Sequence, residues 1–194
     1  MGIRAGPRRE ALKQALKSLP KFTGTADELL ALAQALWGLP EREFRYAAID
    51  LLAKHHKRLD VSALPRILLL VQTDPWWDTV DGLAGVVSDV VLRAKVSQPD
   101  VQHHMDACLV HTHLWVRRVA MLHQLGWREQ ADQDRLFRYA LTLASEKDFF
   151  IRKAIGWALR DHARTRPDAV RSFLARHADQ LSGLTRREAG KHLG

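Results

Sequence analysis

Apolar residues in this chain recur at intervals of three and four, and no segment alternates apolar and polar residues over the length of a strand. This spacing places the apolar side chains on one face of an α-helix. A clear stripe runs through Phe44, Ala47, Ala48, Leu51 and Leu52, while charged residues occupy the other faces of the same segment. The pattern therefore predicts an all-α protein.

The sequence also contains helix start signals. Thr25 with Glu28, and Thr185 with Glu188, have the spacing of a capping box, in which a hydroxyl and a carboxylate each bond a free backbone N–H group. Short turns join the predicted helices into pairs. These pairs span residues 26–57, 62–96, 100–125, 132–164 and 167–193.

Four helices share a pattern that repeats along the chain. Their apolar positions Phe44, Val80, Val116 and Ile151 are separated by 36, 36 and 35 residues. Periods of this length are typical of stacked helical repeats, whose helix pairs bury their apolar faces against neighbouring pairs. We therefore expect a single domain over residues 1–194 that folds as a HEAT-like solenoid, an α-α superhelix.

The residue after each of these apolar positions is charged. In such a solenoid the second helix of each pair lines the concave side, so these side chains are expected along one basic groove that suits a nucleic-acid backbone. The expected residues of the groove are Arg45, Asp81, Arg117, Arg118, Arg152 and Lys153. Near the C-terminus, Arg186, Arg187 and Lys191 are candidates for phosphate contacts, or they form an ordinary solvated helix face.

Composition narrows the class of protein. The 194 residues are 46% hydrophobic, as in a globular protein, and 30 Lys and Arg against 22 Asp and Glu give a net charge of +8. This charge favours a polyanionic partner or an acidic surface. The one cysteine, Cys108, excludes an internal disulfide and is interpreted as a small buried hydrophobe. With no signal peptide and no apolar run long enough to cross a bilayer, we expect a cytoplasmic protein without a membrane partner.

Asp81 is the exception to the repeated pattern, because the other three segments have arginine at this position. Asp74 and Pro75 predict a helix start, so Trp77 and Asp81, four residues apart, lie on one face of the helix. The apolar stripe of this helix leaves Asp81 to one side, where its carboxylate reaches the groove. Asp78 lies in the first turn and is interpreted as complementing the helix dipole. Asp81 is therefore the candidate for chemistry.

Of the six tryptophans, Trp77 shares a helix face with Asp81, and the other five fall into two groups. Trp37, Trp115 and Trp127 are interpreted as packing residues, and Trp76 allows the same interpretation. Trp157 differs because it shares a helix face with cations, which favours either a cation–π pair at the surface or a stacking platform, and both interpretations stay open. The three cations are Lys153, Arg160 and Arg164.

No motif indicates a metal or a cofactor. Four histidines (His103, His104, His111 and His113) lie close together, but no cysteine or carboxylate completes a known ligand spacing. The sequence also contains no glycine-rich phosphate loop and no nucleophile elbow. We therefore expect no metal, no small-molecule cofactor, no nucleotide hydrolysis and no serine-type chemistry.

Several segments together resemble the AlkD-like alkylpurine DNA glycosylases of the DNA alkylation repair family, which are built from HEAT-like repeats. The resemblance covers nearly the whole chain. Its most specific parts are Trp76-Trp77-Asp78-Thr79-Val80-Asp81 and Ile155-Gly156-Trp157-Ala158-Leu159-Arg160. The other matching segments are 36–44, 118–120 and 149–154.

The resemblance implies a function and a site. Asp81 would be the catalytic carboxylate, Trp77 and Trp157 would contact the deoxyribose at the lesion, and Arg118 would support the aspartate or the DNA backbone. Family members excise N3- and N7-alkylated purines from double-stranded DNA without needing to flip the base. We therefore expect a monomeric, monofunctional DNA glycosylase.

The chain departs from the family pattern at its start. The segment Met1-Gly2-Ile3-Arg4-Ala5-Gly6-Pro7 aligns with an internal family segment, and the contact loop is altered to Arg4-Ala5-Gly6. In the family, the helices that precede this segment help to hold the damaged duplex. A second hypothesis is therefore a non-catalytic HEAT-like scaffold or DNA-binding protein that has lost the N-terminal lesion-recognition helices.

Overall fold

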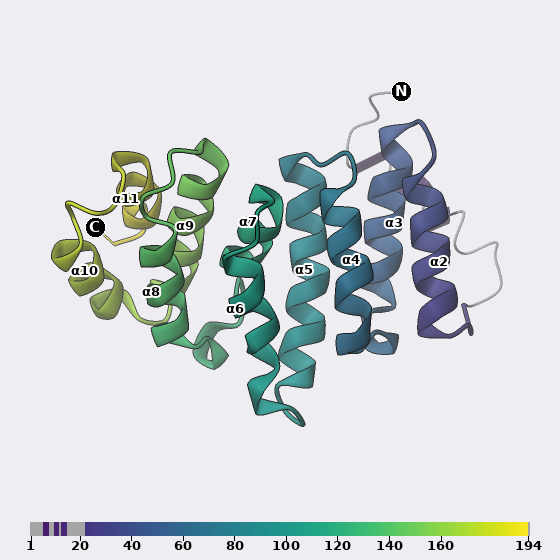
Figure 1. The fold of residues 1–194 in the computed structure, drawn as a ribbon, viewed down its shortest axis with the longest axis horizontal. Helices are drawn as coiled ribbons and strands as arrows, with labels where there is room; N and C mark the ends of the chain where they lie inside the picture. Colours follow the sequence, from purple (N-terminus) through teal and green to yellow (C-terminus); the bar gives the residue numbers. More distant parts are fainter. Residues whose placement is uncertain (1–5, 8–9, 12, 15–21, 194) are drawn as a thin grey trace.

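The computed structural model describes residues 6–7, 10–11, 13–14 and 22–193, and this part of the chain is helical, without β-strands. The prediction of an all-α protein is confirmed. The altered contact loop expected at Arg4-Ala5-Gly6 lies largely outside the described residues. Helices stand side by side in an elongated array, with α2 at one end and α10 and α11 at the other (Figure 1).

Ten α-helices are described between residues 22 and 193. They are α2 (Ala26–Trp37), α3 (Arg42–Lys54), α4 (Leu64–Gln72), α5 (Trp77–Ala94), α6 (His103–Leu109), α7 (Leu114–Leu122), α8 (Gln133–Thr142), α9 (Phe149–His162), α10 (Pro167–Arg176) and α11 (Gly183–Gly190). Short 3₁₀ turns lie between several of them. One of these turns, Pro99–Gln102, occupies the start of the helix pair predicted from residue 100.

The helices pack in the order that a stack of repeats requires. α3, α5, α7, α9 and α11 each pack on the next, and α2, α4, α6, α8 and α10 pack against this row. Hydrogen bonds link neighbouring repeats: the Trp37 indole N–H donates to the Thr73 carbonyl at 3.0 Å, and the Trp127 indole N–H donates to the Ser88 hydroxyl at 2.7 Å. These partners are 36 and 39 residues apart, so the first pair matches the period of 35 to 36 seen in the sequence and the second is three residues longer.

The starts of the helices are only partly as predicted. The capping box of Thr25 and Glu28 is confirmed, since each side chain bonds the other residue's backbone N–H. The start predicted at Asp74 and Pro75 is wrong. α5 begins at Trp77, because its N-cap is Trp76, whose extended backbone (φ −144°, ψ 157°) leaves Pro75 and Trp76 outside the helix.

The capping box predicted for Thr185 and Glu188 is also wrong. α11 begins two residues earlier, with Ser182 as its N-cap and the Ser182 hydroxyl accepting from the Thr185 N–H at 3.0 Å. Thr185 instead donates its hydroxyl to the Arg152 carbonyl on α9, and Glu188 is buried. Contacts between α11 and α9 therefore take the place of the predicted capping box.

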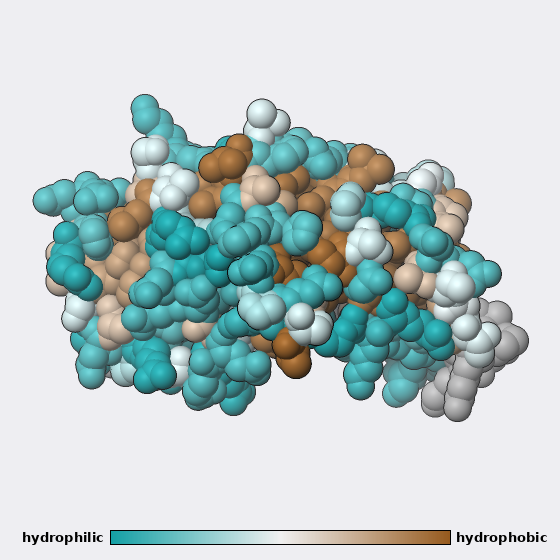
Figure 2. Space-filling view, turned by 60° about the horizontal axis from the view of Figure 1, so that its bottom comes forward, coloured by the Kyte–Doolittle hydropathy of each residue, from teal (hydrophilic) through white to brown (hydrophobic). Residues whose placement is uncertain are grey.

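The apolar stripes form the core, and hydrophilic side chains cover most of the face in Figure 2, with hydrophobic patches between them. Trp37, Trp115 and Trp127 are buried, as predicted, whereas Trp76 is 47% exposed. Burial raises the pKa of the Cys108 thiol to about 11, which fits its interpretation as a hydrophobe. Among the described residues, no helix has the length and apolar character that spanning a membrane requires.

Candidate functional site

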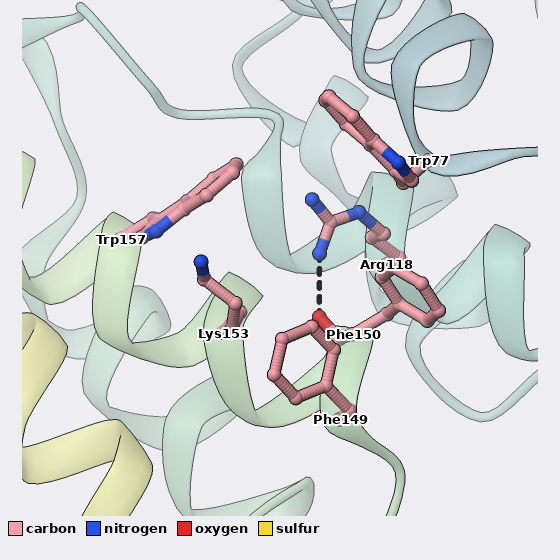
Figure 3. A pocket seen from close by; sticks show the side chains of 6 residues that line it. All are labelled: Trp77, Arg118, Phe149, Phe150, Lys153 and Trp157. Carbon is pink, nitrogen blue, oxygen red and sulfur yellow. Dashed lines mark hydrogen bonds between the residues drawn. The ribbon is translucent and has the colours of Figure 1, made fainter.

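Helices α5, α7 and α9 surround a cavity of about 200 Å³. Trp77 and Trp157 lie on opposite sides of it, with Arg118 and Lys153 between them (Figure 3). The cavity thus combines aromatic surfaces with two positive charges. Its lining side chains are Trp77, Arg118, Phe149, Phe150, Lys153 and Trp157.

Asp81 on α5 joins this site through an ion pair with Arg118 on α7. The Arg118 Nε donates to Asp81 Oδ1 at 2.7 Å, and Nη2 donates to Oδ2 at 2.8 Å. Arg118 is only 1% exposed, whereas the Asp81 side chain is 24% exposed. This two-point geometry fixes the carboxylate while leaving part of it accessible to solvent. Asp81 is not among the side chains that line the cavity.

Arg118 is held on three sides. Besides Asp81, its Nη1 donates to the Phe150 carbonyl in the first turn of α9 (Figure 3). Its guanidinium carbon also lies 5.3 Å from the centroid of the Trp157 ring. Charge-assisted bonds and a cation–π contact therefore offset the cost of burying this charge.

Trp157 makes one of the two contacts that its helix face predicts. The Lys153 ammonium lies 5.0 Å from the centroid of its ring, so the cation–π interpretation is confirmed. Its indole N–H donates to Glu188 on α11 at 3.1 Å. The ring also lines the cavity, so a platform role stays a prediction.

Aromatic side chains are exposed around the site. Trp77 is 42% exposed, Trp76 47% and Phe149 54%. Trp76 packs edge-on against Phe150, with ring centroids 5.6 Å apart, and Phe150 in turn contacts Trp115. Large exposed rings next to buried charge are typical of surfaces that bind a partner.

Comparisons with known proteins agree with this geometry. A family model described as DNA alkylation repair enzyme matches residues 1–193. The chain belongs to this family. Its members act in DNA repair, which implies DNA as the partner. No curated protein matches the chain at a significant level.

Solved structures show the same fold. A predicted DNA alkylation repair enzyme from Enterococcus faecalis is 30% identical, with a TM-score of 0.86 over 100% of this chain and 87% of that one. Two structures from Streptococcus mutans are each 19% identical. They are AlkD2, with a TM-score of 0.68 over 100% of this chain and 92% of that one, and smu.31 from strain UA159, with 0.70 over 97% and 92%. The helical-repeat fold is therefore confirmed.

Arg45 and Arg117, both predicted to bind DNA, are engaged in ion pairs in this member of the DNA alkylation repair family. Arg45 pairs with Asp74, and its side chain is 13% exposed. Arg117 donates to both oxygens of Glu146 at 2.7 and 2.9 Å and to the carbonyls of His111 and Thr112. The partners of Arg117 engage all three of its side-chain nitrogens, and Arg45 is largely buried, so neither side chain is well placed to contact phosphates.

The other predicted cations differ in how free they are. The Arg152 Nε donates to the Glu146 carbonyl at 2.9 Å, and Arg160 and Lys191 both bond Glu188. Within residues 22–193, three are exposed and form no side-chain hydrogen bond or ion pair. These are Arg164, Arg186 and Arg187.

Asp78 has a structural role, as its place in the first turn predicts. It accepts from the Thr79 N–H at 2.8 Å and from the side chains of Tyr46 and Arg42 on α3. Burial alone would raise the pKa of Asp78, but the bonds from Tyr46 and Arg42 hold it below its usual value. Asp78 therefore joins two repeats.

Sequence analysis did not single out Glu188, Phe149 or Phe150 as parts of the site. Phe149 and Phe150 begin α9 and follow its N-cap, Asp148. A pair of aromatic residues at a helix start, next to the Trp157 segment, was the available signal. In the described part of the chain, no three His, Cys, Asp or Glu side chains are grouped so as to hold a metal ion.

Proposed function

We propose that this protein is a DNA glycosylase that hydrolyses the N-glycosidic bond of cationic N3- or N7-alkylated purines in duplex DNA. Asp81 is the proposed catalytic residue. The observation that supports it best is a partly exposed carboxylate, fixed by a buried arginine, beside a cavity with aromatic walls.

The chemistry of the lesion fits a site with one carboxylate. Alkylation at N3 or N7 gives the purine a positive charge, so the base leaves without a general acid. As the bond breaks, positive charge moves to the sugar as an oxocarbenium ion, which a nearby carboxylate stabilises. The same carboxylate can orient the attacking water.

The ion pair with Arg118 determines how many further hydrogen bonds Asp81 can accept and how strongly it attracts a cation. Each carboxylate oxygen accepts one bond from Arg118, so further lone pairs remain for water or for the C1′ side of the sugar. A unit charge about 4 Å from an oxocarbenium ion contributes roughly 4 kcal/mol at an effective dielectric near 20. Because the Arg118 charge opposes this attraction, about a thousandfold in rate is an upper limit.

The cavity charge indicates which part of the substrate enters. Arg118 and Lys153 disfavour a cationic base there, whereas they favour a deoxyribose with its flanking phosphates. The faces of Trp77 and Trp157 offer apolar surface to the sugar. The damaged base then stays outside the cavity, in the duplex.

Phosphates along the duplex need cations that are free. Arg164, Arg186 and Arg187 meet this requirement best, and Arg152 and Lys153 keep donors available. Arg45 and Arg117 contribute less, since Arg45 is largely buried and paired with Asp74, and all three side-chain nitrogens of Arg117 are bonded. The basic concave groove expected from the repeats is the surface we propose for the duplex.

The test is release of 7-methylguanine and 3-methyladenine from alkylated duplex DNA. Wild type and an Asp89→Asn control, an exposed aspartate on the same helix, should release both bases. Asp81→Asn should release them about a hundredfold to a thousandfold more slowly. Equal release by Asp81→Asn and wild type would remove the catalytic assignment.

A second candidate function is a non-catalytic DNA-binding or scaffold protein of the same family. The observation that favours it is that both oxygens of Asp81 already accept from Arg118, as in a purely structural ion pair. This function predicts duplex binding without release of either base by wild type. Base release by wild type that Asp81→Asn slows excludes it.

A further inference from the structure

We infer that Glu188 on α11 is a positioning residue, which holds Trp157 and Lys153 in the arrangement that the cavity needs. The inference deepens the proposed function and assigns a role in the site to the C-terminal helix. Glu188 does not itself line the cavity, so it acts through the lining side chains that it holds.

Glu188 is a buried carboxylate surrounded by donors. It is 7% exposed, and its Oε2 accepts from the Trp157 indole N–H at 3.1 Å and from Arg160 at 3.2 Å. Lys191 donates to both oxygens at 2.9 and 3.0 Å, and the Lys153 ammonium lies 3.9 Å from Oε1. A carboxylate with this many hydrogen bonds and ion pairs belongs to a buried polar network and is not a solvated surface residue.

The donors keep this carboxylate ionised. The bond from Lys191, with the charges of Lys153 and Lys191 and the bond from Trp157, lowers the pKa of Glu188 despite its burial. An ionised Glu188 balances cations that would otherwise repel one another across the Trp157 ring. Lys153 can therefore stay 5.0 Å from that ring and at the cavity wall.

Gly156 brings Glu188 close enough to do this. A Cβ at position 156 would lie 2.4 Å from the Glu188 Cβ and 3.0 Å from the Thr185 carbonyl. Any side chain there would push α11 away from α9. The glycine before Trp157 thus lets the two helix backbones approach until the carboxylate reaches the indole N–H.

Glu188 therefore fixes the orientation of the Trp157 ring. Without Glu188 the indole N–H loses its acceptor, and Lys153 loses its nearest anion. We expect the ring to sample other rotamers and the cavity to lose its shape. The effect should fall on contacts with the lesion sugar and not on the binding of undamaged DNA.

Three variants separate positioning from packing. Glu188→Ala removes the acceptor and the charge, and Glu188→Gln keeps an acceptor for the indole N–H. Thr185→Val is the matched control, because Thr185 bonds Arg152 across the same helix interface without contacting Trp157. Each is compared with wild type at a temperature where unfolding curves show it folded.

The first readout is base release in single turnover from a duplex with one 7-methylguanine. Glu188→Ala should lower the rate about 10- to 100-fold, as expected for losing one bond to a charged group, while Glu188→Gln loses less and Thr185→Val nothing. The effect should be clearly smaller in a Trp157→Phe background, which has no indole N–H and keeps only the contact between Glu188 and Lys153. An effect of equal size in that background, or none at all, would overturn the inference.

The second readout does not depend on catalysis. In the free protein, the Trp157 indole proton should be protected from solvent exchange in wild type and Thr185→Val, and exposed in Glu188→Ala. Unchanged protection in Glu188→Ala would refute the positioning role, whether or not wild type releases a base. If wild type keeps this pattern but releases no base, the proposed glycosylase function fails and the positioning role stands.

Discussion

Replacing Asp81 should destabilise the protein as well as slow its chemistry. Arg118 is 1% exposed, and Asp81 is its only anionic partner among the described residues. Removing one member of a buried ion pair leaves a desolvated charge, which costs about 3–5 kcal/mol when nothing compensates. In Asp81→Asn the amide oxygen still accepts one bond, while the amide nitrogen faces a guanidinium donor.

The expected cost is therefore lower than that range. We expect Asp81→Asn to lose about 2 kcal/mol of unfolding free energy, in line with losing one bond to a charged group. For a chain of this length this corresponds to a fall of roughly 4–8 °C in Tm. Urea unfolding of both proteins measures the free energy, and an unchanged m-value ensures that the comparison is valid.

The matched control is Asp89→Asn. Asp89 lies on the same helix, its side chain is 48% exposed, and its Oδ2 lies 3.9 Å from the His56 Nδ1. This variant should remain within about 0.5 kcal/mol of wild type, as for other surface changes. If Asp81→Asn were as stable as Asp89→Asn, the ion pair would not hold Arg118 and our description of the site would be wrong.

Three further predictions address other parts of the molecule. Burial lowers the pKa of His123 to about 4, so protonation of the unfolded chain should lower the unfolding free energy through this residue by about 2 kcal/mol between about pH 7 and about pH 5. In urea unfolding, His123→Gln should reduce the fall in free energy over this range by about that amount, and an unchanged fall would contradict the prediction. Gly156→Ala should lower the unfolding free energy by about 1–3 kcal/mol, because the new methyl group would collide with α11. A variant as stable as wild type in thermal unfolding would show that α9 and α11 lie farther apart. In DNA-binding titrations, the slope of the logarithm of the binding constant against the logarithm of the salt concentration counts phosphate contacts. Replacing Arg186 and Arg187 together by alanine should reduce this slope by about 2, whereas Arg117→Ala should leave it nearly unchanged. Equal effects would show that ion-paired and free arginines contact phosphates alike.

The core could be predicted from the sequence because it depends on a repeated local pattern. The stripe of α5 is buried at Val80, Leu83, Ala84, Val87 and Val91. A spacing of three and four fixes a helix face, and a period of 35 to 36 fixes which helix packs on which. Neither inference needs knowledge of distant partners.

Whether a charged residue is free or ion-paired could not be predicted from this local pattern. An arginine in a solenoid looks the same in sequence whether it faces a phosphate or a carboxylate. Arg45 and Asp74, like Arg117 and Glu146, are 29 residues apart, as are Asp106 and Arg135. A carboxylate at this fixed distance was a detectable sign of a structural ion pair between repeats.

Glu188 shows why local signals mislead at a site. Its spacing from Thr185 fits a capping box, but α11 takes its cap from Ser182. The Glu188 carboxylate instead accepts hydrogen bonds from Trp157 and Arg160, which lie 31 and 28 residues away in the sequence. Contacts between helices outweighed a cap that contributes only about 1 kcal/mol.

The central claim is that Asp81 stabilises the charge that develops on the sugar. The direct measurement is the single-turnover rate of 7-methylguanine release from a defined duplex, with wild type and Asp81→Asn both at a temperature where unfolding curves show them folded. We predict that Asp81→Asn is slower by about a hundredfold to a thousandfold, with undamaged-duplex affinity little changed. Equal rates for the two folded proteins would contradict the claim.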